Sequence, residues 1–154
     1  MKMNYLLTIL LVLCLASLGI AAGEPFKASL SGSDEIISVS TPAKGEATFE
    51  LDKTGKALRY KVTVSDIENV TAAHVHKGVK GKEGPPVAVI NIEGKREGKF
   101  SGTLANGTIT DKDLIGPMKG GPLRDLVKEI EAGGIYVNVH TAKYPGGEIR
   151  GQLQ

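Results

Sequence analysis

The chain is poor in the residues on which small stapled domains and many enzymes depend. It contains one cysteine, Cys14, no tryptophan and three histidines among 154 residues. A single cysteine cannot form a disulfide framework, so the fold must be stabilised by packing alone. No Gly-x-Ser-x-Gly motif and no phosphate-binding loop occur, and no serine or cysteine nucleophile lies near a histidine by motif. The sequence therefore offers no catalytic residue, and we favour a protein that is not an enzyme.

Long apolar runs are absent except at the N-terminus. Lys2 precedes an apolar stretch at 5–15, and small residues follow as far as Gly23, which is the layout of a secretory signal peptide. We predict cleavage near Ala22 or Gly23, giving a signal peptide at 1–23 and one domain at 24–154. The alternative is an uncleaved anchor, because about 18 apolar residues can span a bilayer. Either interpretation predicts a secreted or cell-envelope protein, whose only membrane contact would be through an uncleaved signal segment.

A strong charge of either sign is also lacking. Beyond the predicted signal peptide, 18 basic residues face 17 acidic ones, since Lys2 is the only charged residue removed with it. This balance argues against nucleic acid or an anionic membrane surface as the partner. A chain of roughly 130 residues suits one domain with one core.

The mature chain is rich in short segments of alternating polarity. Residues 46–51 and 58–64 alternate apolar and polar side chains around Asp52-Lys53-Thr54-Gly55, which predicts a hairpin. Leu123, Leu126, Val127 and Ile130 recur at helical spacing, which predicts one short helix at 122–132. Further strands are expected at 26–30, 70–76, 87–92, 100–109, 135–141 and 148–153. We therefore predict an all-β fold: an antiparallel Greek-key β-sandwich or barrel, immunoglobulin-like or superoxide-dismutase-like, with one short helix.

All three histidines lie in two of the predicted strands. Alternate residues of a strand share a face, so His74 and His76 point the same way, opposite Ala73 and Val75. The same rule places His140 with Asn138, and a third set, Glu148 and Arg150, on outward faces. If these strands are neighbours, the six side chains form one polar patch on the outside of the sheet.

Two interpretations of the histidines remain open. His-x-His on a strand, with a third histidine from a neighbour, could bind zinc or copper and leave a position open for water, with Glu83 or Glu148 as a possible fourth ligand. Alternatively His74, His76 and His140 hydrogen-bond to loop carbonyls and Glu148 and bind no metal, which is the interpretation we favour.

Other polar features have ordinary structural explanations. Glu148 and Arg150 are two residues apart, and we interpret them as a solvated edge pair. Asn69 and Asn106 each begin a glycosylation sequon, which matters only in an exported protein, and Asn106-Gly107 also fits a turn. Lysines of the 77–82 loop are expected to serve solubility.

Several segments of the chain resemble the CHRD domain, named after chordin and found in exported microbial proteins. The most specific are Ala72-Ala73-His74-Val75-His76 and Gly146-Gly147-Glu148-Ile149-Arg150-Gly151-Gln152. Further matching segments are 26–32, 41–49, 84–89, 107–110, 113–114 and 136–141. The chain departs at Asp34-Glu35-Ile36-Ile37-Ser38-Val39, where a Glu-Val-Pro-Pro-like stretch is expected, and this concerns the shape of that loop.

The resemblance implies an immunoglobulin-like β-sandwich or barrel in an extracellular protein, and in chordin the domain belongs to a protein that binds growth factors. We therefore expect an exported, non-catalytic binding or structural module with an extracellular or envelope partner and no cofactor. The alternative is a copper- or zinc-binding protein, possibly redox-active, because the three histidines are also distantly similar to the copper ligands of copper-zinc superoxide dismutase. That protein's bridging histidine, zinc loop and disulfide have no counterpart here.

Overall fold

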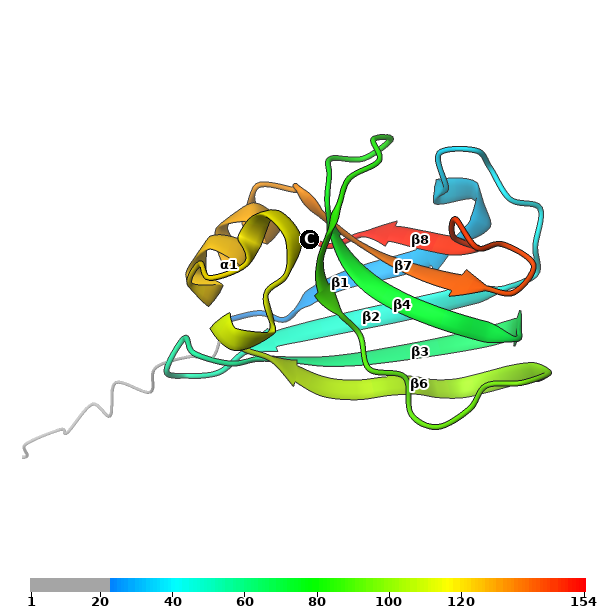
Figure 1. Ribbon diagram of the computed structural model, residues 1–154, viewed down its shortest axis with the longest axis horizontal. Helices are drawn as coiled ribbons and strands as arrows, with labels where there is room; N and C mark the ends of the chain where they lie inside the picture. Colours follow the sequence, from blue (N-terminus) through cyan, green and yellow to red (C-terminus); the bar gives the residue numbers. More distant parts are fainter. Residues whose placement is uncertain (1–22) are drawn as a thin grey trace, which may run out of the picture.

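The computed structural model describes residues 23–154 and consists of one antiparallel sheet that is nearly closed as a barrel (Figure 1). The strand order in the sheet is β5-β4-β7-β8-β1-β2-β3-β6. The elements follow along the chain as β1 (Phe26–Ser31), η1 (Gly32–Asp34), β2 (Lys44–Leu51), β3 (Leu58–Glu68), β4 (Val70–Lys77), β5 (Pro86–Val89), β6 (Lys99–Ile109), η2 (Asp111–Asp113), η3 (Gly116–Met118), α1 (Leu123–Glu131), β7 (Ile135–Thr141) and β8 (Ile149–Gln152).

The predicted fold class is confirmed. The β2–β3 hairpin forms in continuous register from Lys44↔Ser65 to Leu51↔Leu58, around the predicted turn at Asp52. The helix spans Leu123–Glu131, and its four apolar residues are buried. β5 ends at Val89 and is therefore shorter than predicted. The predicted signal peptide lies, apart from Gly23, outside the described residues.

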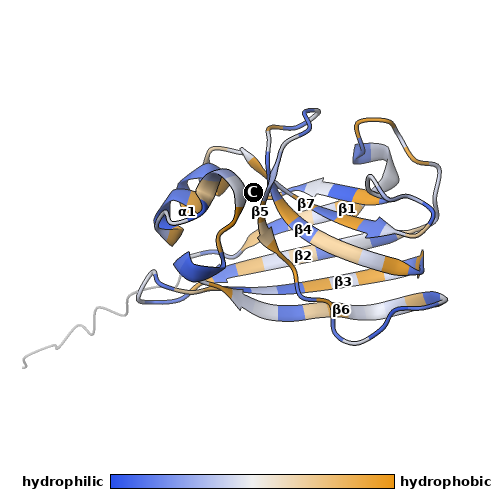
Figure 2. Ribbon diagram, in the orientation of Figure 1, coloured by the Kyte–Doolittle hydropathy of each residue, from blue (hydrophilic) through white to orange (hydrophobic). Residues whose placement is uncertain are grey.

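The core is the interior of the barrel, and the period-two pattern explains it. Alternate residues of β3, from Leu58 to Val64, are buried and those between them are polar. Figure 2 shows hydrophobic and hydrophilic segments along this strand. Leu126 and Ile130 of α1 join the same apolar cluster, so the helix covers one end of the barrel. Within residues 23–154 no helix is both long enough and apolar enough to cross a membrane.

The outer face of β4, β7 and β8 is only partly open to solvent, because three loops border it and cover some of its residues. These are the loops at 32–43, 78–85 and 142–148, between β1 and β2, β4 and β5, and β7 and β8. Tyr136 and Asn138, on the outward face of β7, are each 1% exposed. The sequence rules placed this face outside the sheet, and the loops bury several of its polar side chains while the histidines stay partly exposed.

Candidate functional site

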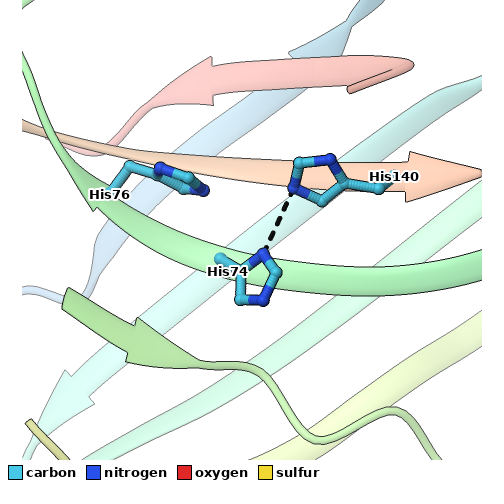
Figure 3. Close-up of side chains that lie close together, drawn as sticks. All are labelled: His74, His76 and His140. Atoms are coloured by element: carbon cyan, nitrogen blue, oxygen red, sulfur yellow. Dashed lines mark hydrogen bonds between the residues drawn. The ribbon is translucent and has the colours of Figure 1, made fainter. Parts of the chain in front are cut away.

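The three histidines meet because β4 and β7 are neighbours in the sheet. The register pairs His76 with Tyr136, His74 with Asn138 and Ala72 with His140. His140 is thus diagonal to His74, and all three imidazoles project from the outer face of the two strands toward one point (Figure 3).

The distances between the imidazoles fit a shared metal ion. His74 Nδ1 and His140 Nε2 are 3.2 Å apart, and one ring nitrogen from each of the three residues lies within 4.8 Å of the others. Metal–nitrogen bonds of 2.0–2.1 Å at a tetrahedral ion place two ligand nitrogens about 3.3 Å apart. The His74–His140 pair already has this spacing, and the 4.8 Å limit on the whole set means that His76 would have to move closer for all three nitrogens to bind one ion.

Two loop carbonyls fix the tautomers of His76 and His140. His76 Nδ1 lies 2.8 Å from the Gly84 carbonyl oxygen, and His140 Nδ1 lies 2.9 Å from that of Pro145. A carbonyl only accepts, so both Nδ1 atoms carry the proton and both Nε2 atoms keep a lone pair. His76 Nε2 is buried without a hydrogen-bond partner. Carbonyl oxygens behind ligand imidazoles are the usual second layer of a metal site.

The surroundings keep the imidazoles neutral. Burial lowers the pKa of His74, His76 and His140 below its ordinary value. Repulsion from the neighbouring histidines lowers the pKa of His74 further. For His76 and His140 the hydrogen bonds to the Gly84 and Pro145 carbonyls oppose the lowering of the pKa, and the positive charge of Arg150 adds to it. Neutral imidazole is the form that binds a metal, so the ligands need little deprotonation near pH 7.

Tyr136 and Gly84 hold His76 in place. The Tyr136 ring stacks on the His76 imidazole at 4.9 Å between centroids and 12° between planes. Its hydroxyl accepts from the Gly84 amide at 3.2 Å and lies 3.3 Å from the Gly84 carbonyl, which is also the His76 partner. A Cβ at residue 84 would overlap the Lys77 carbonyl oxygen, so only glycine fits there.

A buried ion pair lies beside the histidines. Arg150 Nε is 3.1 Å from Glu35 Oε2, and the two side chains are 7% and 5% exposed. The guanidinium also lies over the Tyr136 ring, 4.2 Å from its centroid. Asn138 Nδ2 reaches the same Glu35 oxygen at 3.5 Å. Burial raises the pKa of Glu35, and Arg150 opposes that rise.

The interpretation of Glu148 and Arg150 as a solvated edge pair is wrong. Arg150 pairs with Glu35, and both Glu148 oxygens accept from hydroxyls, of Thr41 at 2.6 Å and Thr141 at 2.7 Å. Gly147, with φ 131°, turns the chain just before Glu148, and β8 begins only at Ile149. Alternation along the strand therefore does not extend to Glu148.

The structure brings together most of the predicted polar patch. His74, His76, His140, Asn138 and Arg150 lie on one face, whereas Glu148 binds the two threonines. Within residues 23–154 the potential ligand group contains the three histidines and no carboxylate, so neither Glu83 nor Glu148 is a fourth ligand in this arrangement.

Sequence reasoning missed Glu35 and Tyr136. Glu35 lies in the 32–43 loop, more than a hundred residues from its partner Arg150, and no local pattern connects them. The available signal was that the segment at 34–39, where the resemblance leads us to expect a Glu-Val-Pro-Pro-like stretch, begins with acidic residues. For Tyr136 the signal was its shared face with Asn138 and His140.

Comparison with known proteins connects this arrangement to one family. Searches of curated proteins and of solved structures each returned no match. The family model for the CHRD domain matches residues 26–153, which include every strand and all the polar side chains described above. The chain therefore belongs to the CHRD domain family.

Proposed function

We propose that this protein is an exported, non-enzymatic CHRD module that binds one divalent transition-metal ion, zinc or copper, through His74, His76 and His140. The observation that carries the proposal is the convergence of three neutral imidazoles, two of them oriented by loop carbonyls through the nitrogen facing away from the cluster. Imidazole nitrogens suit both zinc and copper. Three ligands leave a coordination position for water or a ligand from a partner.

The proposal also covers location and partners. CHRD domains are typical of extracellular proteins, and the predicted signal peptide agrees with that setting. We infer that the module acts outside the cytoplasm, alone or with an envelope protein. The location of the protein and its mass test export. A chain outside the cytoplasm that begins near residue 23 or 24 supports the proposal, and an uncleaved chain retained in the cytoplasm contradicts it.

A metal titration tests the binding site. Protein without a histidine tag is stripped with a chelator, dialysed and titrated with zinc or copper(II). We expect one ion per chain and, at a free concentration a thousand times the dissociation constant, about 4 kcal/mol of added stability. Because the chain has three histidines in all, every imidazole signal in an NMR spectrum belongs to this cluster and should respond.

Single substitutions give the matched comparison. His140→Asn removes one ligand nitrogen and should weaken binding by more than about a hundredfold, since losing even a residue behind a ligand costs 10- to 100-fold. Lys61→Gln, on the exposed face of β3, should leave affinity unchanged. Wild-type protein that rejects both metals, or a His140→Asn variant that binds as well as wild type, would contradict the proposal.

The second candidate function is a module that binds no metal, in which the histidines only hold the loops. The hydrogen bonds from His76 to Gly84 and from His140 to Pro145 favour it. It predicts metal-free protein after purification without chelators and loss of stability in His76→Asn with no metal effect. Elemental analysis of that protein separates the two functions.

A further inference from the structure

A groove with several basic side chains lies on the outer face of the sheet, next to the histidines. Its volume is about 560 Å³, and its floor is formed by outward residues of β1, β7 and β8. The loop between β4 and β5 forms one wall. Tyr136, which stacks on His76, also lines this groove, so the groove and the histidine cluster share one side chain.

The charge in the groove is unbalanced. Of the residues the structure describes, Lys27, Lys80, Lys82 and Arg150 line it, and Asp34 is the one acidic residue that does. Among residues 23–154 the three lysines form no ion pair, whereas Arg150 is paired with Glu35. The groove therefore carries excess positive charge inside a concave surface, where low-dielectric walls concentrate the field.

Arg150 distinguishes this groove from an ordinary lysine-rich surface. The residue is 5% exposed and fixed by Glu35, by the Tyr136 ring and by a 3.3 Å hydrogen bond from Nη1 to the Lys82 carbonyl. The hydrogen bond to Lys82 uses one Nη1 proton, and Nε faces Glu35 without a hydrogen bond of its own. No hydrogen bond to another described residue uses Nη2, so the guanidinium of this groove-lining residue retains unused donors.

We propose that this groove binds a small oxyanion-bearing ligand through Arg150, Lys80 and Lys82. Guanidinium and ammonium donors form their strongest hydrogen bonds with carboxylate, phosphate and sulfate oxygens. The flexible lysines of the 79–82 loop would close over an anion placed on the rigid guanidinium. This site uses none of the three histidines and does not depend on a bound metal.

The test is an NMR titration of metal-free, isotope-labelled protein with phosphate, sulfate or citrate, each compared with chloride at equal ionic strength. We expect saturable amide shifts centred on residues 27–29, 80–82 and 150–152. A response to phosphate or sulfate assigns the site to tetrahedral oxyanions, and a response to citrate alone assigns it to carboxylates. Shifts that do not saturate, or that spread over all the lysines, would overturn the proposal.

Two double variants distinguish a specific anion-binding site from non-specific electrostatic attraction. Lys80→Gln with Lys82→Gln should weaken binding by about tenfold or more, the effect of losing a hydrogen bond between charged groups. Lys53→Gln with Lys56→Gln makes the same change in net charge on the exposed β2–β3 turn and should leave affinity within a factor of two of wild type. Equal weakening in both double variants would show only non-specific attraction and overturn the assignment.

Discussion

Substituting Glu35 with glutamine should destabilise the fold strongly, and the reason lies in its partner. The change keeps the shape of the side chain and removes its charge, which leaves the Arg150 guanidinium 7% exposed without a counter-ion. Removing one partner of a buried ion pair costs about 3–5 kcal/mol. Burial raises the pKa of Glu35, which means that the fold already disfavours its charged form. The cost of the substitution therefore comes from leaving the Arg150 charge unpaired and not from removing the charge of Glu35.

We expect a loss of about 3 kcal/mol, the low end of that range, because the glutamine side chain still presents a polar oxygen to the Arg150 guanidinium. A domain of this size has a total stability of roughly 5–15 kcal/mol, so the melting temperature should fall by about 10 °C. Urea unfolding of metal-free protein, followed by far-ultraviolet circular dichroism, measures the change.

The chain contains its own control for this experiment. Lys95 and Glu97 form a surface pair at 3.7 Å with side chains 89% and 83% exposed, so Glu97→Gln should cost less than about 1 kcal/mol. Replacing both buried partners, as Glu35→Gln with Arg150→Met, should recover much of the loss, because removing both charges leaves nothing unpaired. A Glu35→Gln variant as stable as Glu97→Gln, or a double variant that shows only additive losses, would refute the reasoning.

Three further predictions follow from the same structure. The free energy of unfolding of metal-free protein should fall as pH drops below about 6.5, because folding lowers the imidazole pKa values and the unfolded chain then binds more protons. Urea titrations at pH 7.5 and 5.5 measure this difference, which His74→Gln should reduce, and a free energy that does not change with pH would contradict the burial argument. Tyr136→Phe keeps the stack on His76 but removes the hydroxyl beside Gly84, and should weaken zinc affinity by about tenfold in calorimetric titration, whereas an unchanged affinity would show that the hydroxyl does not position His76. Leu126→Ala empties part of the core under α1 and should cost about 2–5 kcal/mol without changing metal stoichiometry, and a loss of metal binding would show that the barrel end and the site are coupled.

The fold could be predicted from local patterns because the spacing of apolar residues within each element indicates which of its side chains are buried. Residues 58–64 alternate strictly, and Leu123, Leu126, Val127 and Ile130 recur at helical spacing, so the strand and the helix were both found. Strand parity also grouped His74 with His76, and Asn138 with His140. The pairing of β4 with β7 brings the two groups together. The alternation of side chains along a strand does not indicate which strands are neighbours, so this pairing had to be assumed.

The loops over the site could not be predicted, for two physical reasons. Glu35 reaches Arg150 through a fold of the 32–43 loop, and ion pairing across such a distance has no periodic signature. Glu148 leaves the expected face because Gly147 adopts a positive φ just before β8 begins, and alternation fails where the ladder ends. Both errors concern residues outside regular strands, where a side chain's direction depends on the turn rather than on parity.

The two interpretations of the histidines do not compete for the same atoms. Loop binding uses Nδ1 of His76 and His140, whereas metal binding needs Nε2 of both, and a neutral imidazole can serve one purpose on each nitrogen. His74 is the exception: without a metal its Nδ1 donates to His140 Nε2, and an ion between them would require that proton to move to the other nitrogen. The loop carbonyls therefore act in favour of metal binding, since they fix the tautomers that leave the lone pairs facing inward. Loss of a loop contact should weaken the metal site, and an empty metal site should leave the loop contacts in place.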